Sequence, residues 1–180
     1  MRLTSQGFSH LRLMRLLPAR APHLDLLWDL LMATPDYSLL ITRRLPTRQD
    51  AWELLNDCPA GITAQDKLVL AIMDEQHIVG CIDLVRGYPT PETAFLALLQ
   101  LRPAAQGQGL GSAMLCEIMA QAAAWHCTRL RLAVIETNGP GLTFWLRHGF
   151  CQVGRRSLPQ YVGDALLMER AVCPPYPQTE

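Results

Sequence analysis

Apolar residues recur with two different periods along this chain, and the period changes near residue 67. Upstream, leucines repeat at three- and four-residue intervals, which predicts a helix over Pro22–Ala33. Thr47, followed by Asp50 three positions later, predicts the capped start of a second helix. Residues 36–41 lie between these helices and show no clear period, so we expect an irregular or short extended connection there.

Short apolar runs separated by turn residues predict strands over most of the remaining chain. The expected strands are Ser9–Leu17, Leu68–Met73, Ile78–Val85, Thr93–Leu101, Arg129–Ile135, Phe150–Arg156 and Asp164–Met168, and further helices are expected over Leu110–His126 and Leu142–His148. The order β-α-α-β-β-β-α-β-α-β-β predicts a mixed sheet with helices on its faces, in the α/β (α+β) class. We expect residues 1–172 to form one domain and residues 173–180 a loose tail.

Charge and composition narrow the classes of function. Sixteen basic and 16 acidic residues give a formal net charge of +0, so we expect no nucleic-acid partner. No apolar run reaches the roughly 18 residues of a membrane helix, and arginines interrupt the N-terminal apolar stretch. We therefore expect a cytoplasmic protein without a membrane partner.

The cysteines and the apolar content add two expectations. The six cysteines are scattered, without a metal-ligand spacing, so we expect no metal. Cys116 and Cys151 fall in apolar surroundings and are expected to be buried. Because 49% of the residues are hydrophobic, surplus apolar surface makes a homodimer an open expectation.

A glycine-rich segment follows the expected strand Thr93–Leu101. It reads Gln106-Gly107-Gln108-Gly109-Leu110-Gly111-Ser112, and a long helical pattern begins at Leu110. The first N–H groups of a helix have no internal partner and lie at the positive end of its dipole. Glycines allow phosphate oxygens to approach that backbone closely. The segment therefore predicts a cradle for a pyrophosphate.

Two segments together resemble the GNAT superfamily of acyl-CoA-dependent N-acyltransferases. Gln106–Gly111 is similar to the family's Gln/Arg-x-x-Gly-x-Gly/Ala signature, with Leu101-Arg-Pro103 where the family usually has Val-x-Pro. Asn138, followed by Phe144-Trp145-Leu146-Arg147-His148-Gly149-Phe150, resembles the family's Asn…Phe-Tyr-x-x-x-Gly-Phe segment. The order of elements also fits, so the resemblance implies a GNAT-like fold whose central sheet is splayed at the cofactor site.

The resemblance implies an N-acetyltransferase that moves an acetyl group from acetyl-CoA directly to a primary amine of a small molecule or peptide. The phosphates would lie on the backbone of Gly107, Gln108, Gly109, Gly111 and Ser112. Leu99, Gln100 and Leu101 would bind the pantetheine arm as if it were an added strand. The N–H of Leu101 would stabilise the oxyanion.

Further contacts to the arm are implied by the second segment. Asn138 would bond a pantetheine amide, a role compatible with that of a helix N-cap. Phe144 and Trp145 would pack beside the arm and the sulfur, and packing in the core is an alternative for both.

The sequence departs from the family at the proton-transfer groups. Trp145 stands where the family often has the tyrosine that serves as general acid, and indole donates no proton at neutral pH. His148, Tyr161 or Tyr88 could replace it, or the thiolate could leave unassisted. His148 could instead belong to a solvated helix end.

No residue at the family's usual position identifies the general base. The interior of the strand Thr93–Leu101 has no carboxylate where the family often has one. Asp83 is a candidate base on the preceding strand, although we favour a carboxylate that faces solvent at the sheet edge.

Two other functions follow from these departures and from the glycine spacing. A non-catalytic CoA-binding or regulatory module would explain the missing tyrosine and base. A dinucleotide-dependent oxidoreductase is disfavoured, because Gly107-x-Gly109-x-Gly111 is one residue short of the dinucleotide fingerprint and lies past mid-chain. The sequence does not indicate which amine is the acceptor.

Overall fold

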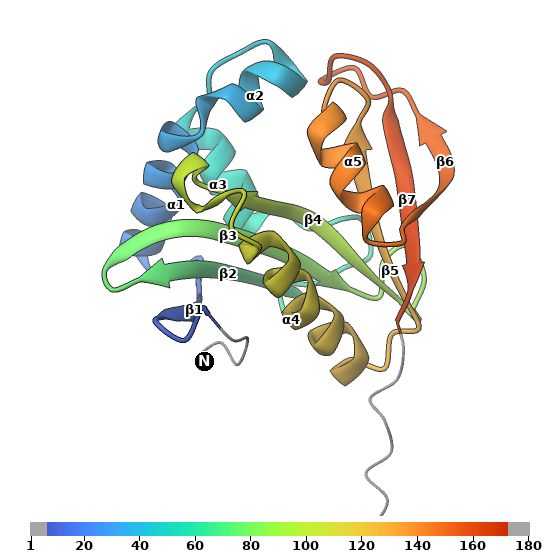
Figure 1. The fold of residues 1–180 in the computed structure, drawn as a ribbon, viewed down its shortest axis with the longest axis horizontal. Coiled ribbons are helices and arrows are strands. Elements are labelled where there is room, and N and C mark those ends of the chain that lie inside the picture. The colour runs from blue at the N-terminus through green and yellow to red at the C-terminus, as the bar shows by residue number, and fades with distance from the viewer. Residues whose placement is uncertain (1–6, 173–180) are drawn as a thin grey trace, which may run out of the picture.

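Seven strands hydrogen-bond into one mixed sheet in the order β1-β2-β3-β4-β5-β7-β6 in the computed structural model, which describes residues 7–172 (Figure 1). The strands are β1 (Leu11–Arg15), β2 (Lys67–Asp74), β3 (His77–Arg86), β4 (Thr93–Leu101), β5 (Arg129–Ile135), β6 (Cys151–Arg156) and β7 (Ala165–Ala171). The helices are α1 (Ala21–Ala33), α2 (Pro35–Thr42), α3 (Arg48–Asn56), α4 (Leu110–Ala124) and α5 (Gly139–Arg147), and a 3-10 turn, η1, covers Pro103–Ala105. The predicted fold class is confirmed. The expected tail, residues 173–180, lies outside the described residues.

The prediction of an irregular or extended connection over residues 36–41 is wrong, because this segment lies in the helix α2. Pro35 occupies the first turn, where its missing N–H costs nothing, and Asp36 complements the helix dipole there. Arg43 closes the helix in a left-handed conformation, with φ of 57°. By contrast, the capping box of Thr47 and Asp50 is present at the start of α3, as predicted.

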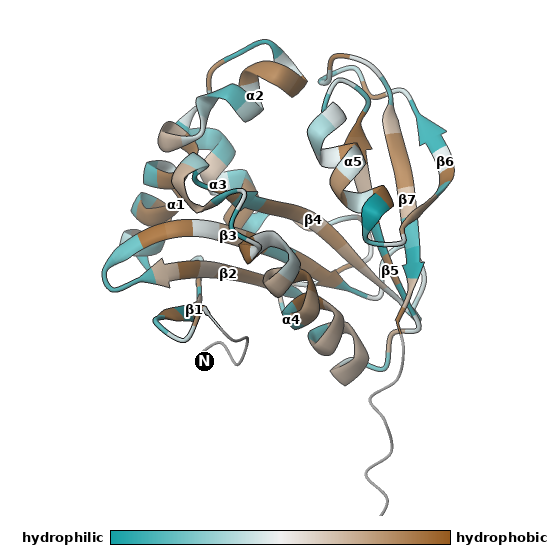
Figure 2. Cartoon of the chain, viewed as in Figure 1, coloured by the Kyte–Doolittle hydropathy of each residue, from teal (hydrophilic) through white to brown (hydrophobic). Residues whose placement is uncertain are grey.

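Helices cover both faces of the sheet. The buried face of α4 packs with Leu84 of β3 and Leu96 of β4, and Trp145 of α5 joins the same core. On the opposite face, α1 and α3 pack against Ala71 of β2 and Cys81 of β3. In Figure 2 brown, hydrophobic residues run along these central strands, whereas β6 at the edge of the sheet is mostly exposed and ends in hydrophilic residues.

The two halves of the sheet diverge at its centre. Strands β4 and β5 run parallel and pair only over Thr93–Leu96 and Arg129–Leu132. The whole of β5 also pairs with β7 on its other side, and β4 has an open edge beyond Leu96, where its pairing with β5 ends. The predicted splay is therefore present, and it begins before Leu101.

Helix α2 connects the two diverging halves on the face of α1. The N–H of Val162 donates to the carbonyl of Ile41 at 2.8 Å. The hydroxyl of Thr137 donates to the carbonyl of Leu40 at 2.9 Å. These bonds hold the C-terminal half of α2 against the segments around β5 and β7.

Two expectations about cysteine burial are wrong. Cys116 on α4 and Cys151 on β6 are both exposed. Cys116 points away from the buried stripe of α4, and Cys151 lies on the edge strand. No helix among residues 7–172 is long and apolar enough to cross a membrane.

Candidate active site

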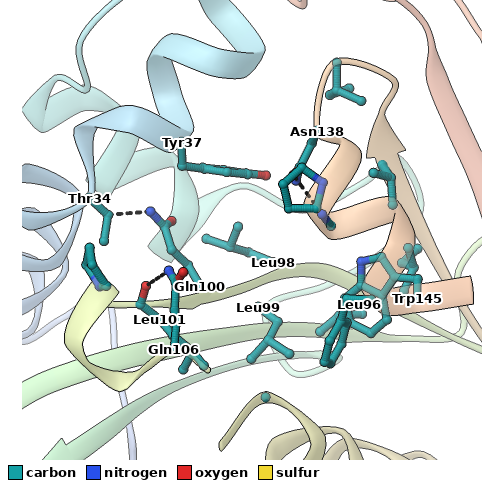
Figure 3. A pocket seen from close by; sticks show the side chains of 18 of the residues that line it. Thr34, Tyr37, Leu96, Leu98, Leu99, Gln100, Leu101, Gln106, Asn138 and Trp145 are labelled. Atoms are coloured by element: carbon teal, nitrogen blue, oxygen red, sulfur yellow. Dashed lines mark hydrogen bonds between the residues drawn. The ribbon is translucent and has the colours of Figure 1, made fainter. Parts of the chain in front are cut away.

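A pocket of about 590 Å³ lies at the divergence of β4 and β5. Its walls come from α1, α2, β4, the glycine loop, β5 and α5, so both faces of the sheet contribute to it (Figure 3). Its lining includes most of the predicted cofactor-binding residues: Leu99, Gln100, Leu101, Gln106, Gly107, Gly109, Gly111, Ser112, Asn138, Phe144 and Trp145. Gln108 and Leu110 are outside the lining, and Leu110 is buried in the core.

The glycine loop presents its backbone to the pocket at the start of α4. Gly107 and Gly109 have φ of 73° and 86°, in the left-handed region that favours glycine. Gly109 is the N-cap, and neither a side-chain cap nor an acidic residue occupies the first turn of α4. The unpaired N–H groups of this turn can therefore accept an anion. The loop has the conformation that a phosphate cradle requires.

The open edge of β4 offers backbone groups to the same pocket. The N–H of Arg102 donates to the carbonyl of Val79 at 2.8 Å, toward β3. Because such bonds alternate along an antiparallel strand, the N–H groups of Leu99 and Leu101 point to the opposite side, where β5 has diverged. The carbonyl of Leu101 accepts a bond of 2.8 Å from Gln106 Nε2. An extended chain added at this edge could therefore hydrogen-bond the N–H and carbonyl of Leu99 and the N–H of Leu101.

Asn138 caps α5 and lines the pocket. Its Oδ1 accepts from the N–H of Gly141 at 3.0 Å, which confirms the capping role. Gly141 has no room for a side chain there, because a Cβ would lie 2.5 Å from Asn138 Nδ2. The cap uses the oxygen of the amide, which leaves the Nδ2 protons for a ligand carbonyl.

Phe144 and Trp145 form the α5 wall of the pocket. Their rings meet edge to face, with centroids 4.8 Å apart, and Trp145 packs on Phe150 in the same way at 5.2 Å. Trp145 is 9% exposed, so it belongs to the core and lines the pocket at once. A Cβ at Gly111 would lie 3.3 Å from Phe144, so glycine permits the close approach of α4 to α5.

His148 lies beside the start of α4 and outside the pocket lining. Its Nδ1 donates to the carbonyl of Phe144 at 2.8 Å, and its Nε2 lies 2.9 Å from the hydroxyl of Ser112. A carbonyl only accepts, so the proton of the neutral ring is on Nδ1 and Nε2 accepts from Ser112. His148 therefore orients Ser112 in the first turn of α4.

Asp83 is buried, which corrects the expectation that its carboxylate faces solvent. It is 3% exposed and pairs with Lys67 of β2 at 2.8 Å. Burial raises the pKa of Asp83 above its usual range, and the Lys67 ammonium opposes the shift. Asp83 Oδ1 has no hydrogen-bond partner, and the residue does not line the pocket. Its role as a base stays a prediction.

Two tyrosines from different segments lie near α2. Tyr37 of α2 lines the pocket, and its hydroxyl points across it toward Asn138 (Figure 3). Tyr161 packs in the same apolar cluster with Ile41 and Ile135, outside the lining. Burial raises the pKa of Tyr37 to about 12 and also raises that of Tyr161. Tyr37 is thus a protonated phenol inside the pocket at neutral pH.

Two pocket residues were not assigned their present positions from the sequence. Residues 36–41 were expected to form a connection and not a helix, so the position of Tyr37 in the pocket lining was not predicted. The backbone of Gln100 pairs with Cys81 of β3. Its side chain hydrogen-bonds Thr34, which lies between α1 and α2. No group of three or more His, Cys, Asp or Glu residues within 7–172 is placed to hold a metal ion.

Comparisons with known proteins agree with this geometry. The model of the acetyltransferase (GNAT) family matches residues 26–150. The structure is similar to an acetyltransferase from Thermus thermophilus, with 26% identity, 95% of this chain and 99% of that chain covered, and a TM-score of 0.75.

Two further solved structures share the fold. They are the paia N-acetyltransferase from Thermoplasma acidophilum in complex with coenzyme A (16% identity, 89% and 98% covered, TM-score 0.65) and the IAA acetyltransferase from Bacillus cereus (15%, 89% and 99%, 0.60). No curated protein matches the chain. The family match spans well over half of the chain and includes the glycine loop and the α5 segment. The chain therefore belongs to the GNAT acetyltransferase family, whose members transfer acyl groups from acyl-CoA.

Proposed function

We propose that the protein transfers an acetyl group from acetyl-CoA directly to a primary amine of a small molecule or a peptide. One observation carries the proposal: the pocket at the open edge of β4 is lined from both faces of the sheet. An acyl donor held on the side of α4 and an amine held on the side of α2 would meet at Leu101. The described chain thus offers a place for each substrate.

The side of α4 suits the phosphates and the arm of acetyl-CoA, which supplies the activated thioester. The backbone N–H groups around Gly107 and Gly109 receive the pyrophosphate at the start of α4. Leu99 binds the arm through its outward backbone groups, the Leu101 N–H faces the thioester end of the arm, and Asn138 Nδ2 binds an amide carbonyl of the arm. These roles are inferred from the open groups described above.

The N–H of Leu101 is placed to receive the negative charge that develops on the thioester oxygen. A donor fixed in a low-dielectric site stabilises such charge more than water does. The incoming amine must be neutral, and its proton leaves to solvent through the mouth of the pocket. The buried Asp83 is available as a base only if the Lys67 pair opens.

Tyr37 is the best-placed donor for the departing sulfur. The three donors predicted from the sequence lie elsewhere: His148 holds Ser112, Tyr161 packs behind Tyr37, and Tyr88 lines a separate pocket of about 190 Å³. Tyr37 therefore takes the role that Trp145 cannot perform, since its phenol keeps its proton at neutral pH.

Release of free thiol from acetyl-CoA tests the proposed function. We expect release that depends on both the enzyme and an added amine, across a panel of alkylamines, polyamines, amino acids and peptides. Saturable binding of acetyl-CoA without thiol release from any amine would overturn the transferase and favour a CoA-binding module.

A further inference from the structure

A buried glutamine on the acceptor side has one amide atom without a partner. Gln100 is 6% exposed and lines the pocket. Its Nε2 donates to the hydroxyl oxygen of Thr34, at the junction of α1 and α2. Its Oε1 is buried and has no hydrogen-bond partner. A buried carbonyl without a donor is rare, and it indicates a group that a ligand satisfies.

The chain itself fixes which end of the Gln100 amide is unpaired. The Thr34 hydroxyl donates its only proton to the carbonyl of Leu30 at 2.8 Å. Since that carbonyl can only accept, the Thr34 oxygen is left as an acceptor and must face the NH₂ end of the amide. With the hydroxyl proton on the Leu30 carbonyl, exchanging the two ends of the amide would bring two acceptors together. The orientation of Gln100 therefore follows from the Thr34–Leu30 hydrogen bond.

The unpaired oxygen lies on the side where an acceptor would enter. Figure 3 shows the Gln100 amide between Thr34 and Leu98, below the ring of Tyr37. The oxygen itself is inaccessible to solvent, although Gln100 lines the pocket. Contact with a ligand N–H therefore requires the side chains around the oxygen to move aside.

We infer that Gln100 determines the acceptor specificity of this pocket by accepting an N–H of a primary amine. The inference rests on the proposed function and deepens it. An amide oxygen holds an N–H without taking the proton, so it orients the nitrogen lone pair away from itself. Gln100 is thus a positioning residue for the acceptor and is separate from the groups that move protons.

The charges around the pocket narrow the amine further. Among the described residues that line it, only Asp36 and Arg147 are charged. Asp36 lies in the first turn of α2, on the acceptor side, whereas Arg147 is at the end of α5, next to His148 and the phosphate end. A carboxylate on the amine-bearing carbon would face Asp36, and no cation among the described residues lines that side of the pocket. The favoured acceptors are therefore primary amines that lack such a carboxylate.

Matched pairs of amines test the class directly. We expect kcat/KM to be at least tenfold higher for 2-phenylethylamine than for phenylalanine, and for agmatine than for arginine. Phenylalaninamide, which keeps the size but not the charge, should resemble phenylethylamine. Equal rates within each pair, or a preference for the free amino acids, would overturn the inference.

Two isosteric variants at glutamines on opposite sides of the pocket test the role of Gln100. Gln100→Met should raise KM for the amine about tenfold, as expected for one lost hydrogen bond to a buried group, with KM for acetyl-CoA within twofold. Gln106→Met should raise KM for acetyl-CoA and leave KM for the amine nearly unchanged, because Gln106 bonds Leu101 on the cofactor side. Equal changes in both KM values of Gln100→Met would contradict a positioning role.

Thr34→Val keeps the test valid if Gln100→Met does not fold. It removes the acceptor that orients the amide, so we expect a smaller rise in the same amine KM. Calorimetric binding of 2-phenylethylamine and phenylalanine to the CoA-saturated protein gives a readout without turnover. Selective, Gln100-dependent amine binding without thiol release would overturn only the transferase, whereas turnover without selectivity would overturn only the inference.

Discussion

At the scale of single residues, two glycines with nearly the same backbone conformation separate ligand binding from folding. Gly109 has φ of 86° and Gly61 has φ of 83°, and a Cβ would meet nothing within 4 Å at either. Valine at each position should cost on the order of 1–2 kcal/mol of stability, because left-handed backbone disfavours side chains. Gly109→Val should also weaken acetyl-CoA binding at least tenfold by calorimetry, whereas Gly61→Val should not. Equal affinities would show that the loop does not hold the cofactor.

Tyr37 predicts a change of stability at alkaline pH. The folded protein keeps the phenolic proton up to a pKa of about 12, whereas the unfolded chain loses it near 10. The unfolded state binds fewer protons in this window, so the free energy of unfolding falls as pH rises from 10 toward 12. Urea unfolding from pH 9 to 11.5 should show a loss up to about 2 kcal/mol greater in wild type than in Tyr37→Phe. Parallel pH profiles would contradict this environment for Tyr37.

The same tyrosine and its neighbour give a test of proton donation. Tyr37→Phe should lower kcat about 100-fold, the order expected for losing a general acid, with little change in KM for acetyl-CoA. Tyr161→Phe is the matched control, because it removes a phenol from the same cluster but outside the pocket lining. The reverse ranking of the two variants would assign the donor role to Tyr161.

Sequence reasoning was limited at this scale by partners that lie far apart in the chain. The Asn138 cap depends on neighbours three residues away and was predictable. The burial of Asp83 depends on Lys67, 16 positions upstream on another strand, and its carboxylate was wrongly expected to face solvent. The Gln100–Thr34 contact spans 66 positions, so no local pattern indicates it.

At the scale of elements, β2 and β3 are joined across one face by the Lys67–Asp83 pair. Lys67→Met should cost about 3–5 kcal/mol, because it leaves a buried carboxylate without its counter-charge. The double variant Lys67→Met/Asp83→Leu should recover most of that loss, since apolar residues can replace a buried pair. Urea denaturation measures both.

The double variant also decides the role of Asp83. A folded double variant with kcat near wild type would assign Asp83 a structural role. A folded double variant with kcat reduced by orders of magnitude would make Asp83 the base predicted from the sequence.

Helix α2 shows why one element was missed. Its eight residues contain an apolar stretch, Leu39-Leu40-Ile41, that fits either an extended segment or a helix. Its helical state is supported by tertiary contacts, in which Ile41 packs on Ile135 and Ala165 and the carbonyl of Leu40 accepts from Thr137. The strands and α4, with long and clear patterns, were predicted to within a few residues.

At the scale of the whole molecule, the divergence of β4 and β5 creates the site. Four paired positions hold the two strands together at one end, and α2 connects the halves across the other. The glycine loop and α5 border the pocket from one face, and α1 and α2 border it from the other. The two sequence motifs predicted the side formed by the glycine loop and α5. The side formed by α1 and α2 is built from residues that belong to no motif, so the acceptor could not be predicted from the sequence.

Simultaneous measurement of both products tests the central claim most directly. Purified protein, acetyl-CoA and 2-phenylethylamine should yield free thiol and N-acetylated amine in equal amounts, the first by a thiol reagent and the second by mass spectrometry. Gly109→Val at the same concentrations should yield at least tenfold less of both. Thiol release without acetylated amine, or no product from a wild-type protein that binds acetyl-CoA, would contradict the account.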